Sequence, residues 1–69
     1  MTTADVERVA RGLIVERGFP CTLLSVTAAA TGWNIMVRAG TGALVRFAVS
    51  SQRPIAVRET IRETLETAL

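Results

Sequence analysis

Residues 33–50 read WNIMVRAGTGALVRFAVS, and this stretch has the pattern of a β-hairpin. Apolar residues occupy the odd positions from Trp33 to Val37 and again from Ala43 to Val49. A period of two residues in β-branched and aromatic side chains is typical of strands that bury one face. Glycines separate the two runs at residues 40–42, so the sequence predicts two antiparallel strands joined there by a tight turn.

One register of this hairpin keeps both apolar sets on the same face. A three-residue turn places Val37 opposite Val45, Ile35 opposite Phe47 and Trp33 opposite Val49. A slip of one residue would move the apolar set of one strand to the wrong face. Such a turn often needs a left-handed residue near its end, and Gly42 can adopt that conformation. We therefore expect this register, with Phe47 in the core.

An amphipathic helix is predicted over residues 3–17. Its apolar positions follow the i, i+3, i+4 spacing of a single helix face. They are Val6, Val9, Ala10, Leu13 and Ile14. Thr2 or Thr3 supplies a capping oxygen at the start. Gly18 and Pro20 form a stop signal, because glycine adopts the left-handed cap and proline cannot continue a helix.

Residues 21–28 form the first strand in this interpretation. One alternating set consists of Leu24, Val26 and Ala28, and this set is expected to face the core. Leu23 falls on the opposite face. A turn at residues 29–32 then pairs the first strand with the second, with Ala28 opposite Trp33, Val26 opposite Ile35 and Leu24 opposite Val37.

A second helix is predicted from Pro54, because proline suits the first helical position. Ser50 or Ser51 supplies a capping oxygen. The apolar positions spaced for one helix face are Val57, Ile61, Leu65 and Ala68. Arginines and glutamates occupy most positions between them, which indicates a solvated outer face.

These elements predict a single α+β domain over residues 1–69 with the order α-β-β-β-α. The strands form a three-stranded antiparallel meander. Two helices that each carry one apolar stripe pack on one face of this sheet. A chain of 69 residues has a core near the lower limit for independent stability.

This element order resembles the double-stranded-RNA-binding fold and the small HicA-type toxins that share it. The RNA-binding family opens its second helix with a cluster of lysines, whereas residues 52–56, QRPIA, hold one Arg. Its first strand-to-strand loop carries a His motif, and residues 29–32, AATG, do not. HicA-type toxins use a His for catalysis, and this chain has none. The resemblance covers the topology of the whole chain and carries over no functional residue.

The second face of the predicted sheet has no helix to cover it. By parity it carries three apolar residues, Leu23, Met36 and Leu44. Arg38 and Arg46 share this face, and the hairpin register makes them diagonal neighbours. We interpret these five residues as a candidate interface, because neighbouring exposed apolar side chains mark contact surfaces.

Composition argues against several classes of function. The net charge of +2, from eight arginines and six acids, is small for a protein that binds polyanions. There is no His, which is the commonest general base and metal ligand. Cys21 has no identifiable base, and Glu59, Glu63 and Glu66 are interleaved with arginines as on a solvated helix face. We therefore expect no catalytic residue, no cofactor site and no metal site.

A membrane span is a second interpretation of residues 18–37, a charge-free run of twenty residues. The run also contains proline, glycine and several hydroxyl side chains, so two strands and a turn are favoured. The lone Cys21 excludes an internal disulfide and fits a reducing compartment. We expect a cytoplasmic protein with no membrane partner.

The sequence favours a non-enzymatic module that acts by protein association. Hydrophobic residues make up 49% of the chain, which is high for so small a soluble protein and indicates surplus apolar surface. We expect the partner to be a second copy, in a homodimer that forms through the open sheet face or an edge strand, or else an unknown protein. The alternative is weak nucleic-acid binding through Arg38, Arg46, Arg53 and Arg58.

Overall fold

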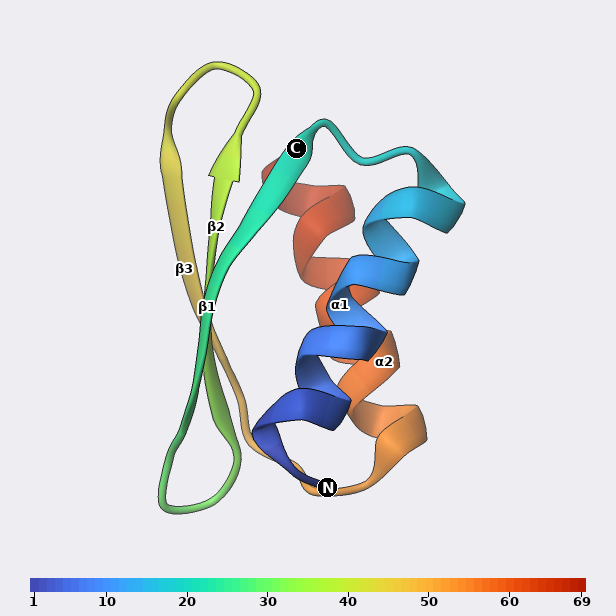
Figure 1. The fold of residues 1–69 in the computed structure, drawn as a ribbon, viewed down its shortest axis with the longest axis vertical. Coiled ribbons are helices and arrows are strands. Elements are labelled where there is room, and N and C mark those ends of the chain that lie inside the picture. Colours follow the sequence, from blue (N-terminus) through green and yellow to red (C-terminus); the bar gives the residue numbers. More distant parts are fainter.

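The computed structural model describes residues 1–69 and places both helices on one side of a three-stranded sheet (Figure 1). The chain runs through α1 (Thr3–Arg17), β1 (Cys21–Ala28), β2 (Trp33–Ala39), β3 (Leu44–Val49) and α2 (Pro54–Ala68). The strands lie in the order β1-β2-β3, so each one pairs with its neighbour in sequence. The predicted α+β class, the element order and the antiparallel meander are confirmed.

Helix α1 has strong signals at both ends. Thr2 and Asp5 form a capping box, in which the Asp5 amide donates to Thr2 Oγ1 at 3.2 Å and the Thr2 amide donates to Asp5 Oδ2 at 2.8 Å. These hydrogen bonds to Thr2, with a nearby Arg8, lower the pKa of the Asp5 carboxyl. Gly18 ends the helix in the left-handed conformation, with φ of 66°.

The hairpin of β2 and β3 has the predicted register. Its pairs include Val37 with Val45, Ile35 with Phe47 and Trp33 with Val49. At the turn, the Ala39 amide donates to the Ala43 carbonyl at 2.8 Å. Gly42 takes a φ of 92°, which is the conformation that the turn was expected to require of it.

The pairing of β1 with β2 differs from the prediction in one half of the strand. Ala28 and Val26 pair as expected, but a β-bulge between Leu23 and Ser25 places Leu23, not Leu24, opposite Val37. The extra residue of a bulge reverses which residues face the core beyond it. Leu23 is therefore only 9% exposed, whereas Leu24 is 40% exposed.

The core lies between the sheet and the helices and consists of twelve buried apolar side chains. Ile35 and Val37 of the central strand and Val57, Ile61 and Leu65 of α2 are among its most enclosed members. Trp33 is also buried, and its indole N–H has no hydrogen-bond partner. Leaving a buried donor unpaired reduces stability, so Trp33 contributes through packing alone.

Three local expectations about the core and the caps are corrected. Phe47 is only partly buried, because the helices cover β3 fully at Val49 but incompletely at this position. Ala68 is exposed in the last turn of α2. The N-cap of α2 is Arg53 and has no side-chain cap bond, since Ser51 Oγ accepts from the Arg53 amide just before the helix begins.

Gly32 occupies a position where the fold leaves no room for a side chain. It is buried immediately before β2, and a Cβ atom built on it would overlap the carbonyl oxygen of Val49 on β3. Only a residue without a side chain allows the two strands to approach this closely. Gly12 is the opposite case, because it lies in α1 and a Cβ atom built on it would meet no other atom within 4 Å.

We expect opposite effects from the same substitution at these two glycines. Gly32→Ala should lower the free energy of unfolding by about 1–3 kcal/mol or more, because the methyl group meets rigid backbone. Gly12→Ala should raise it by about 0.5–1 kcal/mol, since alanine is the better helix former. Urea unfolding followed by circular dichroism measures both. Equal stability of the two variants would contradict the close contact of Gly32 with Val49.

Candidate functional site

The sheet face opposite the helices is uncovered, and Figure 1 shows no element on that side. It carries residues of all three strands: Thr22, Leu24, Ser25 and Thr27 from β1, Asn34, Met36 and Arg38 from β2, and Leu44, Arg46 and Ala48 from β3. We call this surface the open face. A shallow hollow at its centre is lined by Ser25, Thr27, Asn34, Met36 and Arg46, among others.

Four of the five predicted interface residues lie on the open face. Met36 pairs directly with Arg46, and Arg38 pairs directly with Leu44. The two arginines are therefore diagonal neighbours across β2 and β3, as the hairpin register predicted. Leu44 is 50% exposed, and Met36 is partly buried in the middle of the sheet.

The fifth predicted interface residue, Leu23, is misplaced by the sequence analysis. The β-bulge turns Leu23 toward the helices, where it joins the core. Leu24 takes its place on the exposed side and is the apolar residue that sequence reasoning missed. Two adjacent leucines fit either parity equally well, so the pattern alone contains no signal for the bulge.

Charge is divided unevenly between the two layers. All six acidic residues lie in the helices, together with five of the eight arginines. The strands hold only Arg38 and Arg46 as charged residues, and neither forms an ion pair within the chain. The open face is therefore cationic, with apolar side chains next to its two arginines and hydroxyl side chains on β1.

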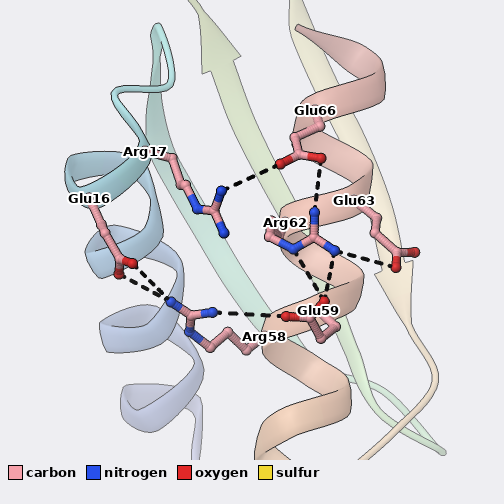
Figure 2. Close-up of polar contacts among 7 residues, drawn as sticks. All are labelled: Glu16, Arg17, Arg58, Glu59, Arg62, Glu63 and Glu66. Carbon is pink, nitrogen blue, oxygen red and sulfur yellow. Dashed lines mark hydrogen bonds and ion pairs between the residues drawn. The ribbon is translucent and has the colours of Figure 1, made fainter.

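The other two arginines proposed for nucleic-acid contact do not share this surface. Arg58 lies in the helix layer, where its Nη2 is 3.1 Å from Glu16 Oε2 of α1 and its Nη1 is 3.9 Å from Glu59 (Figure 2). Arg53 precedes α2 as its N-cap. The structure brings Arg38 and Arg46 together and leaves Arg58 engaged between the helices.

Arg62 is the centre of the ion pairs on α2 (Figure 2). Its guanidinium lies 2.7 Å from Glu59 Oε2 and 2.9 Å from Glu66 Oε2, each about one helical turn away. The hydrogen bond from Arg62 lowers the pKa of the Glu59 carboxyl, and the two carboxylates raise the pKa of Arg62. Arg17 of α1 reaches Glu66 at 4.0 Å, so the cluster also links the two helices.

Cys21 and the carboxylates are the remaining groups with reactive or metal-binding side chains. Cys21 is partly buried at the start of β1, and burial raises the pKa of its thiol, which keeps it protonated at neutral pH. No three Cys, Asp or Glu side chains are grouped as ligands for a metal ion. Neither helix is long and apolar enough to cross a membrane.

No protein-family model matches the chain, and no curated protein or solved structure matches it. The functional argument therefore starts from the open face itself. This surface combines exposed apolar side chains with two unpaired cations, and it belongs to a sheet whose other side is filled by the core.

Because of the β-bulge, we expect Leu23 and Leu24 to contribute very differently to stability. Leu23→Ala should lower the free energy of unfolding by about 2–5 kcal/mol, because it leaves a cavity under the helices. Leu24→Ala should lower it by less than about 1 kcal/mol, as is usual for surface positions. Thermal and urea unfolding of the two variants measure this. A larger loss of stability for Leu24→Ala than for Leu23→Ala would contradict the β-bulge and support the uninterrupted pairing predicted from the sequence.

Proposed function

We propose that this chain acts by association with a second copy of itself, through sheet surface that its helices leave uncovered. The open face or an edge strand makes the contact. The role is one of binding and assembly rather than catalysis.

The observation that carries this proposal is the exposure of apolar side chains on the sheet, both on the open face and, at Val45 and Phe47, beside the edge strand β3. Leu24 and Leu44 are 40% and 50% exposed, and Met36 lies between them on the central strand. The helix side of the same sheet is filled by the core, so no element of the chain is left to cover them. Neighbouring apolar side chains of this kind mark interaction surfaces.

Solution mass as a function of concentration tests the proposal. We expect sedimentation equilibrium to show a monomer–dimer equilibrium for the intact chain. Because the contact is apolar, raising the concentration of a salt such as sulfate should leave the dimer intact or strengthen it. A chain that remains monomeric up to millimolar concentration would contradict self-association by either route.

Nucleic-acid binding is the second candidate, and the cationic character of the open face favours it. Arg38 and Arg46 are diagonal neighbours with no carboxylate among the strands, so their guanidinium groups are free to contact phosphates. Arg53 and Arg58 belong to the helix layer and its entry segment, which limits the cationic surface to two side chains.

Replacement of both arginines tests this candidate. The Arg38→Ala, Arg46→Ala variant should weaken the binding of labelled RNA and DNA at low salt for all sequences alike, and should lower the salt slope by about 2. Arg8→Ala with Arg11→Ala on α1 is the matched control, since it removes the same charge from the helix layer. An equal loss of nucleic-acid affinity in the two double variants would exclude the open face as a phosphate-binding surface. The absence of binding by the intact chain would exclude it as well.

A further inference from the structure

The two edges of the sheet differ in how well they resist pairing with another strand. The β1 edge is interrupted by the β-bulge at Leu24, a device that makes an edge irregular. The β3 edge pairs with β2 without interruption from Leu44 to Val49 and contains no proline. Its only charged residue, Arg46, points to the open face and not toward the helices. β3 therefore has neither a bulge nor a proline to interrupt its edge, and Arg46 is its only protective charge.

The backbone of β3 presents unpaired groups along this edge. The hydrogen bond from the Ala39 amide to the Ala43 carbonyl fixes which residues bond to β2. Because antiparallel pairs alternate, the amides of Val45, Phe47 and Val49 point toward β2. The amides and carbonyls of Leu44, Arg46 and Ala48 point away from the sheet, where a further strand would bind.

Apolar side chains beside this edge are also incompletely covered. Val45 and Phe47 face the helices and pack against the core, yet both remain partly exposed. Their partners on the central strand, Val37 and Ile35, are 1% and 2% exposed. The helix layer thus covers β3 at Val49, which is 1% exposed, but only incompletely at Val45 and Phe47, whose apolar side chains lie beside the unpaired backbone.

We propose that β3 pairs antiparallel with β3 of a second copy across a two-fold axis. The product is a continuous six-stranded sheet with all four helices on one face. This inference rests on the proposed self-association and specifies its site. Pairing satisfies the unpaired backbone groups and places the partner's apolar strip against Val45 and Phe47.

Charge favours this edge contact over a face-to-face dimer. Stacking two open faces would enclose Arg38 and Arg46 of both copies between the sheets with no carboxylate from either side. Enclosing like charges without counterions is strongly unfavourable. Edge pairing leaves the open faces side by side, and all four guanidinium groups stay in water.

The side chains of β3 also select one register. A two-fold axis at Arg46 would set this residue directly opposite its own copy, and like charges in that position are destabilising. An axis at Phe47 sets the two Phe47 rings opposite each other, Val45 opposite the partner's Val49, and Arg46 opposite the partner's Ala48. Apolar residues then meet apolar residues along the whole helix-facing side, and aromatic pairs of this kind are favourable.

Proline substitution tests the edge without disturbing the existing sheet. Ala48 forms a non-hydrogen-bonded pair with Asn34, so Ala48→Pro removes only an outward amide that donates across the proposed interface. Ala28→Pro is the matched control on the other edge, because the bond from the Ala29 amide to the Gly32 carbonyl makes the Ala28 amide point outward as well.

We expect Ala48→Pro to raise the dimer Kd about tenfold or more, since two hydrogen bonds are lost per dimer. Ala28→Pro and Met36→Glu should leave the Kd within about twofold of the wild type. If only Met36→Glu weakens the dimer, the contact lies on the open face. If only Ala28→Pro weakens it, the contact lies at the β1 edge. Either result overturns this inference and leaves self-association standing, whereas a monomeric wild type removes both.

Crosslinking tests the register independently of the proline variants. In a Cys21→Ser background, Phe47→Cys should form an interchain disulfide under mild oxidation, because Cα atoms of such opposed pairs are about 4.5 Å apart. Leu44→Cys is the control, since two copies of residue 44 would lie about 20 Å apart in this register. Efficient crosslinking at residue 44 and none at residue 47 would overturn the proposed pairing.

Discussion

Burial of alternate side chains of β2 beneath the two helices is the constraint on which the rest of this structure depends. Trp33, Ile35 and Val37 are almost completely buried. Because each of them pairs with a residue of β1 and a residue of β3, their burial decides which residues of those strands face the helices. The apolar stripes of α1 and α2 match this one face. With no third layer in the chain, the same constraint leaves the other face of the sheet in contact with water.

The sequence predicted the parts of the fold that depend on local pattern. The α1 cap at Thr2, the left-handed Gly42 and the β2–β3 register all follow from turn chemistry and a period of two. Each of these signals lies within a few residues of the element that it specifies. The period of two residues in β2 also predicted that Met36 lies on the open face.

The errors occurred where tertiary context decided between equal local choices. Leu23 and Leu24 are chemically identical, and only the packing of the helices against β1 selects one of them for the core. Arg58 pairs with Glu16, a residue 42 positions away, so its engagement depends on how α1 and α2 lie together. Phe47 has the pattern of a core residue, but the helix layer does not extend fully over β3.

The β-bulge of β1 has a consequence for the size of any assembly built on this sheet. A sheet with two receptive edges adds copies at both ends and grows into an open fibre. If the bulge prevents pairing at the β1 edge, each chain has only the β3 edge for pairing with another copy. A two-fold contact through β3 then occupies that edge in both copies. In the proposed dimer, the irregularity at Leu24 would therefore stop further strands from adding at β1 and would limit the assembly to two copies.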